Sequence, residues 1–179
     1  MTDQNGNDYI IGGLKLRQLT VEDAVSIMEV QEVTLQSLPD PLWYYPSAME
    51  QFAECCAGGE CFGYFSRGKL VGFATLTPSH ARPQRCYAGK LNHSPENTYD
   101  VQDVMVLPKF RRRGVHSALL RLFEETAYAL GSVALYATIA PDNLPSVSSF
   151  EKAGYERVAV QPAYDGRMRA YYCKRLRSE

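Results

Sequence analysis

The feature that most constrains this chain is the alternation of strand-like and helix-like segments along its length. Apolar or alternating patterns typical of strands cover residues 14–19, 61–65, 70–76, 99–107, 132–140, 155–160 and 168–174. Helical spacing with one apolar face covers residues 20–38, 48–56, 114–130 and a short stretch that ends at 153. This order predicts an α/β (α+β) fold in which helices cover a mixed sheet with antiparallel strands at its ends.

Length and charge limit the number of domains and the class of partner. A chain of 179 residues with 45% hydrophobic residues is the size of one globular domain. We therefore expect a single domain over residues 13–179, preceded by a flexible N-terminal tail over residues 1–12. The formal net charge of -1 provides no overall field that would attract nucleic acid or an anionic membrane, so neither is an expected partner.

The cysteines and the N-terminus indicate the compartment. Five cysteines make an odd number and include no CxxC pair, which favours reduced thiols over a disulfide framework or a zinc site. The polar first residues do not resemble a secretory leader, and no apolar run reaches the roughly 18 residues of a membrane span. The sequence therefore predicts a cytoplasmic protein without a metal.

Residues 104–117 carry the strongest chemical signal. An apolar strand passes through a proline turn at Pro108 into three arginines and Gly114, at the expected start of a helix. Amide N–H groups at a helix N-terminus bind phosphate, and glycine lets a ligand approach the backbone. On spacing alone, a phosphate site and a solvated basic face are equally good interpretations of this segment.

Two motifs resemble one known family. Residues 106–116 are similar to the acetyl-CoA signature of the GNAT family of N-acetyltransferases, which reads Gln or Arg, two residues, Gly, one residue, then Gly or Ala. Arg111 and Gly114 match this signature, whereas His116 does not. Residues 138–143 and 149–155 resemble the second CoA-side motif of the family, and the resemblance extends over about residues 14–176.

This resemblance implies a mostly antiparallel, splayed sheet of six to seven strands flanked by about four helices, with acetyl-CoA as co-substrate. The backbone of Val104, Met105 and Val106 would bind the pantetheine arm and the thioester carbonyl. The pyrophosphate would be bound by Arg111, Arg112, Arg113, Gly114, Val115, His116 and Ser117. Further CoA contacts would come from Asn143, Phe150 and Lys152.

Two of these residues have plainer interpretations. Asn143 could equally be the N-cap of the helix that follows it. His116 could crowd the phosphates or donate to them, but we interpret it as a partly exposed histidine at the start of a helix.

Proton transfer would require a base for the amine and an acid for the thiolate. Asp100 and Asp103 are the candidate bases, although either could be a structural carboxylate. Phe150 stands where many family members have a tyrosine acid, so Ser149, Tyr155 or solvent would replace it. Trp43, Tyr44 and Tyr45 could wall the acceptor pocket or simply pack their segment onto the sheet.

The sequence thus predicts an acyl-CoA-dependent N-acyltransferase. It would move acetyl from acetyl-CoA to a primary amine of a small molecule or peptide by direct attack. The departures at His116 and Phe150 motivate an alternative, a catalytically weak CoA-binding sensor or scaffold module. The terminal strands offer an edge at which two copies could pair as a homodimer.

Overall fold

The computed structural model describes residues 10–176, apart from the side chain of Gln84, and these residues divide into two compact units. The first unit comprises residues 10–39, 46–75 and 103–119, and the second comprises residues 40–45, 76–102 and 120–176. Two strands and one helix run through both units.

The described residues form one eight-stranded sheet and five α-helices. The strands are β1 (Ile10–Ile11), β2 (Leu14–Gln18), β3 (Cys61–Ser66), β4 (Lys69–Pro78), β5 (Thr98–Val106), β6 (Ala134–Ile139), β7 (Glu156–Ala163) and β8 (Arg167–Arg175). The helices are α1 (Ala24–Gln36), α2 (Met49–Ala57), α3 (Tyr87–Lys90), α4 (Val115–Ala129) and α5 (Leu144–Lys152).

Strand pairing confirms the predicted mixed, mostly antiparallel α+β sheet. The strand order is β1-β2-β3-β4-β5-β6-β8-β7. Strands β5 and β6 pair in parallel, whereas β1–β2, β2–β3, β3–β4, β6–β8 and β7–β8 are antiparallel. The strand beyond the six or seven predicted is β1, a two-residue strand in the segment predicted to be a tail. The rest of that predicted tail, residues 1–9, lies outside the described residues.

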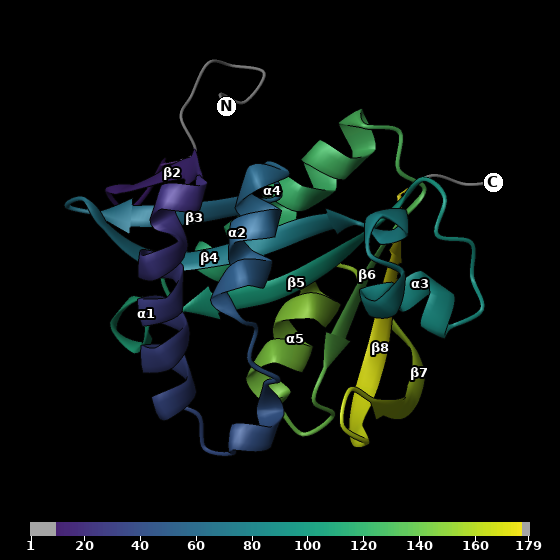
Figure 1. Cartoon of the computed structure of the whole chain (residues 1–179). Helices are drawn as coiled ribbons and strands as arrows, with labels where there is room; N and C mark the ends of the chain where they lie inside the picture. The colour runs from purple at the N-terminus through teal and green to yellow at the C-terminus, as the bar shows by residue number, and fades with distance from the viewer. Residues whose placement is uncertain (1–9, 177–179) are drawn as a thin grey trace. The chain divides into compact units, whose positions relative to one another are not determined.

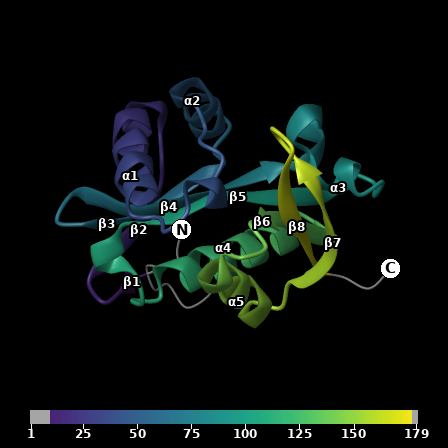
Figure 2. The ribbon, with the colours of Figure 1, turned by 90° about the horizontal axis from the view of Figure 1, so that it is seen from below.

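In the first unit, a hairpin is covered by two helices. Strands β3 and β4 are joined by Arg67 and Gly68, which have φ of 49° and 79°, as a two-residue turn between right-twisted strands requires. Helices α1 and α2 lie side by side on one face of these strands (Figures 1 and 2). Phe52 of α2 meets Phe73 of β4 edge to face, with ring centroids 5.4 Å apart and both side chains buried. This packing holds β4 in place against the helical layer.

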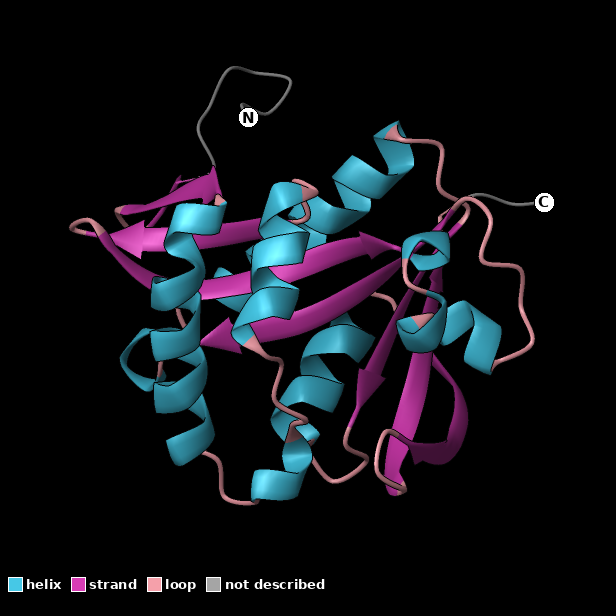
Figure 3. Ribbon diagram, viewed as in Figure 1, coloured by secondary structure: helices cyan, strands magenta, loops and turns pink. Residues whose placement is uncertain are grey.

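The second unit is built around β8, which pairs with β6 on one side and β7 on the other. Residues 78–97 contain three prolines and have no clear period, which predicts a long surface loop. The structure instead forms short helices in this segment, at Ser79–Ala81, Pro83–Arg85 and Tyr87–Lys90 (Figure 3). The buried ring of Tyr87 packs edge to face on Tyr171 of β8, with centroids 6.1 Å apart. A periodicity argument misses helices of three or four residues because they contain about one turn.

Candidate functional site

Strand β5 has an irregular backbone conformation just before the predicted thioester-binding residues. Asp103 has φ +54°, a left-handed conformation that does not occur in a regular β-strand. Its carboxylate accepts hydrogen bonds from Ser47 Oγ at 3.1 Å and from Thr75 Oγ1 at 3.3 Å. Two hydroxyl donors thus hold this residue in the conformation that redirects the backbone entering Val104.

Gly72 of β4 lies closely against the same part of β5. A Cβ atom at Gly72 would lie 2.9 Å from the carbonyl oxygen of Met105 and 3.3 Å from the side chain of Val106. Leu107 N donates to Val71 O at 2.9 Å, which joins the end of β5 to β4. Only glycine permits this approach. The sequence analysis missed Gly72 because a glycine in a strand shows its role only when its neighbour is known.

The loop after β5 presents backbone amides at the start of α4. Arg112 and Gly114 have φ of +60° and +83°, and the first helical bond runs from Ala118 N to Gly114 O at 2.9 Å. Helix geometry therefore leaves the amides of residues 115–117 without a partner inside the helix. The side chains of Arg112 and Arg113 are exposed. An exposed basic loop leading into the N-terminal amides of a helix has the donor set that a pyrophosphate needs.

The side chain of Arg111 makes two hydrogen bonds within the first unit. Its Nε donates to Val106 O at 3.2 Å, and its Nη2 donates to Ser37 Oγ at 2.7 Å. Desolvation lowers the pKa of Arg111 from its ordinary value. The guanidinium thus connects the end of β5 to the C-terminus of α1, while its backbone remains part of the predicted phosphate loop.

His116 lies in the first turn of α4 and is partly exposed, as predicted. Burial lowers the pKa of its imidazole to about 4. The ring is therefore neutral at pH 7 and contributes no positive charge toward a phosphate. Its departure from the Gly or Ala of the signature changes the volume at this position but not the charge.

Asp100 is the more deeply buried of the two candidate bases. Its side chain is 1% exposed, with Oδ1 accepting from Ser79 Oγ at 3.0 Å and Oδ2 accepting from Tyr87 N at 3.1 Å. Burial raises its pKa to about 7, against the opposing effect of these two donors. A carboxyl group that titrates near neutral pH suits proton transfer.

Helix α5 begins at Asn143, whose Oδ1 accepts from Ser146 N at 3.3 Å, so the N-cap interpretation of this residue is correct. Ser149 Oγ donates to Pro145 O at 2.9 Å, within the helix. Phe150 is buried and packs edge to face on Tyr155, with centroids 5.0 Å apart.

Two further predicted residues of this region differ in exposure. The Tyr155 hydroxyl is buried and has no hydrogen-bond partner among the described residues. Burial raises its pKa well above the usual range. Lys152 ends α5 with an exposed side chain. Of the two predicted acids, Ser149 is thus bonded within its own helix and Tyr155 is part of the core.

The predicted aromatic segment, residues 43–45, is bound to β8 and the turn before it. Arg169 Nη1 donates to Trp43 O at 2.7 Å, and Arg167 Nη1 donates to Tyr44 O at 2.8 Å. Tyr45 stacks on Tyr164 with centroids 4.8 Å apart and ring planes 12° apart. The packing interpretation of this segment is therefore correct, and a role in acceptor binding is compatible with it.

A chain of hydroxyl groups lies beside this segment. The Tyr164 hydroxyl is 3.1 Å from the Tyr87 hydroxyl and 3.0 Å from Thr138 Oγ1. Burial raises the pKa of Tyr87, so its hydroxyl stays protonated at neutral pH. The sequence analysis missed these residues because no spacing rule joins positions 87, 138 and 164.

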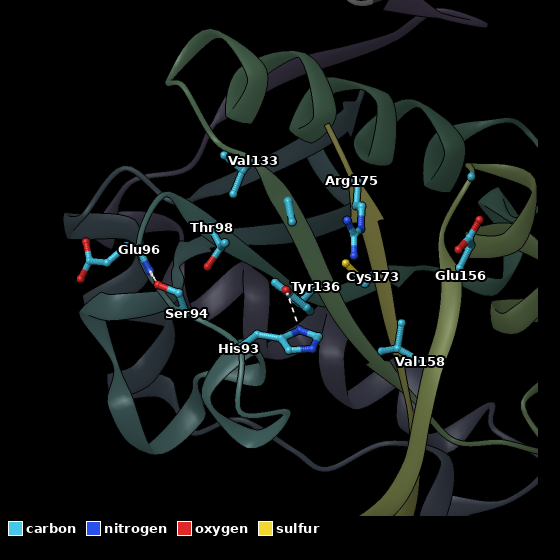
Figure 4. Close-up of a pocket in the computed structure, with 12 residues that line it drawn as sticks. His93, Ser94, Glu96, Thr98, Val133, Tyr136, Glu156, Val158, Cys173 and Arg175 are labelled. Atoms are coloured by element: carbon cyan, nitrogen blue, oxygen red, sulfur yellow. Dashed lines mark hydrogen bonds between the residues drawn. The ribbon is translucent and has the colours of Figure 1, made fainter. Parts of the chain in front are cut away.

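A separate cavity of about 490 Å³ lies in the second unit (Figure 4). Its lining includes His93, whose Nδ1 is 2.9 Å from the Tyr136 hydroxyl, and the thiol of Cys173. None of the predicted site residues lines this cavity. It therefore plays no part in the site that the sequence motifs indicate.

Residues 10–176 contain neither a cluster of metal-ligand side chains nor a membrane-spanning helix. No group of three or more His, Cys, Asp or Glu side chains in this range could hold a metal ion. No helix within the same range is both long and apolar enough to cross a membrane.

Comparison with known proteins places these features in a family context. A sequence model described as the Acetyltransferase (GNAT) family matches residues 27–155, more than half of the chain. An uncharacterized protein of Mycobacterium leprae is 35% identical over 95 residues, which cover 53% of this chain and 22% of that protein. The N-alpha-acetyltransferase RimI of Mycobacterium tuberculosis is 28% identical over 102 residues, which cover 57% of this chain and 55% of that protein. The matched region thus spans about half or less of these relatives.

Solved structures show the same fold. A phosphinothricin acetyltransferase of Sinorhizobium meliloti, in complex with acetyl-CoA, superposes with a TM-score of 0.69 at 19% identity. The superposition covers 91% of this chain and 88% of that chain. At this level of identity the likeness establishes the architecture, and chemistry has to be argued from the residues of this chain.

Proposed function

Because the chain belongs to the acetyltransferase (GNAT) family, we propose that it transfers acetyl from acetyl-CoA to a primary amine. The observation that carries this proposal is the segment from Asp103 to Ser117. It combines a strand with one left-handed residue, Asp103, an exposed basic loop and the first amides of a helix in one compact unit. Acetyl-CoA is the bound co-substrate of a structural neighbour, and its pyrophosphate matches this donor set.

In this proposal the first unit binds the co-substrate. The amides of residues 111–117 would bind the pyrophosphate. Gly114 keeps the backbone accessible because, among residues 10–176, only Ile11 lies within 4 Å of its Cβ position, at 3.8 Å. The backbone of residues 104–106 would bind the pantetheine arm and hold the thioester carbonyl. When bound, acetyl-CoA supplies an activated acyl group whose thiolate is a fair leaving group.

The reaction itself requires two proton movements. A bond forms between the amine nitrogen and the acetyl carbon, the carbon–sulfur bond breaks, the amine loses a proton and the thiolate gains one. Asp100 of the second unit has a pKa of about 7, which suits a general base near neutral pH. For the thiolate we infer protonation by solvent, because Ser149 Oγ donates within α5 and the Tyr155 hydroxyl is buried.

The test measures acetyl-CoA binding by calorimetry and release of free CoA thiol in the presence of a panel of primary amines. We expect binding, and CoA release that depends on the amine. Binding without release for every amine would favour the alternative of a sensor or scaffold module. Absence of acetyl-CoA binding would overturn both.

A matched pair of variants locates the phosphate site. Gly114→Asp places a negative charge at the N-terminus of α4, whereas Gly131→Asp places the same residue just past its C-terminus. The two glycines have φ of +83° and +81°, so the backbone strain is equal. Only Gly114→Asp should abolish acetyl-CoA binding. Equal affinities in the two variants would show that the phosphates bind elsewhere.

A further inference from the structure

Arg169 on β8 is a buried cation without an anionic partner. The residue is 4% exposed, and its Nη1 donates to the backbone oxygen of Trp43 at 2.7 Å. The nearby carboxylate of Asp165 is engaged by Arg167, which donates to both of its oxygens at 2.7 and 2.6 Å. No carboxylate of the described residues pairs with Arg169.

The unused donors of Arg169 form one edge of the guanidinium. Its Nε is buried and has no hydrogen-bond partner among residues 10–176, and Nη1 is committed to Trp43. Nε and Nη2 together present the parallel pair of N–H groups that binds a carboxylate in a bidentate manner. Trp43 adds a second buried donor, because its Nε1 also has no partner within the described residues.

The Arg169 guanidinium stays positively charged, and its surroundings among the described residues provide no negative charge to balance it. Burial lowers the pKa of Arg169, and the hydroxyls of Tyr164, Tyr87 and Tyr44 oppose this effect. Arginine stays protonated at neutral pH even so. The guanidinium lies over the Tyr164 ring at 5.6 Å from its centroid. An aromatic and hydroxyl lining stabilises a cation weakly, and an unpaired buried charge is unfavourable.

We propose that Arg169 binds a carboxylate of the acceptor, so that the acceptor is an amine that also carries an acidic group. This inference rests on the proposed function. Arg169 is hydrogen-bonded to the aromatic segment for which the sequence offered either a packing role or a place in the acceptor pocket, and it supplies the two parallel donors that a carboxylate requires. The carboxylate is either the α-carboxylate of an amino acid or an acidic side chain of a peptide.

The test uses acceptor pairs that differ only in charge. One pair is an amino acid and its C-terminal amide; the other is a short peptide that begins with Asp and its Asn counterpart. CoA release should show a lower KM for the acid of one pair, and that pair identifies the source of the carboxylate. Acetylation of acid and amide with equal KM in both pairs would overturn this inference and leave the proposed function intact. A chain that acetylates no amine would overturn the proposed function first.

Two variants distinguish carboxylate binding by Arg169 from its structural role in holding the aromatic segment. Arg169→Met should raise KM for the acid about 10- to 100-fold, the loss expected for a charge-assisted hydrogen bond, and leave KM for the amide within about threefold. Arg167→Met removes the neighbouring bond to Tyr44 O and controls for loosening of the aromatic segment. If Arg169→Met raises KM equally for acid and amide, and by as much as Arg167→Met does, then Arg169 only holds the aromatic segment on β8 and does not bind the acceptor.

Thermal unfolding supplies a second readout. Arg169→Met removes an unpaired buried charge, so its Tm without acceptor should equal or exceed that of the parent chain. Arg167→Met breaks an ion pair and should lower Tm. If Arg169→Met does not fold, Trp43→Phe, which replaces the indole and its Nε1–H by a smaller phenyl ring, tests the second donor by the same comparison. KM for the acid should rise more than KM for the amide, and equal changes would overturn the inference.

Discussion

Gly72→Ala is the substitution whose effect the structure defines most narrowly. The new Cβ would lie 2.9 Å from Met105 O, whereas ordinary contact begins at about 3.4 Å, so β4 and β5 must separate by about half an ångström. The obstacle is backbone, which cannot rotate away as a side chain can. Gly72 has no left-handed φ, so the effect is steric and not conformational.

We expect two consequences of this separation. Overpacking of this kind costs about 1–3 kcal/mol, which lowers Tm by about 2–12 °C in a chain of this length. Displacement of the Met105 peptide should also weaken one hydrogen bond to the pantetheine arm. Loss of a neutral hydrogen bond of about 0.5–1.5 kcal/mol corresponds to about a 2- to 12-fold rise in the Kd for acetyl-CoA.

The assay combines thermal unfolding with calorimetric titration of acetyl-CoA. Gly63→Ala in the neighbouring strand is the control, because its Cβ meets the flexible side chains of Leu70 and Leu19 at 2.5 and 3.0 Å. That variant should lose stability and keep its acetyl-CoA affinity. The reasoning would be refuted if Gly72→Ala bound acetyl-CoA with parental affinity and retained the parental Tm.

Two further predictions concern side chains of known geometry. Arg111→Met removes the bonds to Val106 O and Ser37 Oγ, so we expect a loss of about 1–2 kcal/mol in the free energy of unfolding, against less than about 0.5 kcal/mol for Arg112→Met in urea titrations. Asp100 has a folded pKa of about 7, above its unfolded value, so the folded state retains a proton that the unfolded state has lost between about pH 4 and 7. Stability should therefore fall as pH rises through this window, by up to about 4 kcal/mol more in the parent chain than in Asp100→Asn. Parallel stability curves for the two proteins would show that Asp100 is ionised in the folded state.

The sequence was sufficient where the signal is local. The strands over residues 61–65 and 70–76, the helix that begins after Gly114 and the helix capped by Asn143 were predicted because capping and hydrophobic period act over a few residues. The family motifs extend this reach, since they preserve the spacing between a strand, a turn and a helix. The short helices before β5 were missed because one turn leaves no measurable period.

The tertiary structure decided which side chains meet. In the sequence, Gly72 is an ordinary glycine within a strand; the structure shows that β5 lies closely against it. Arg169 is one of several arginines near the C-terminus in the sequence; the structure shows that it is buried. Burial then determines their chemistry: it raises the pKa of Asp100, lowers the pKa of His116 and leaves the Arg169 guanidinium without a counter-ion among the described residues. Desolvation and close approach depend on distances between residues far apart in the chain, and periodicity carries no information about such distances.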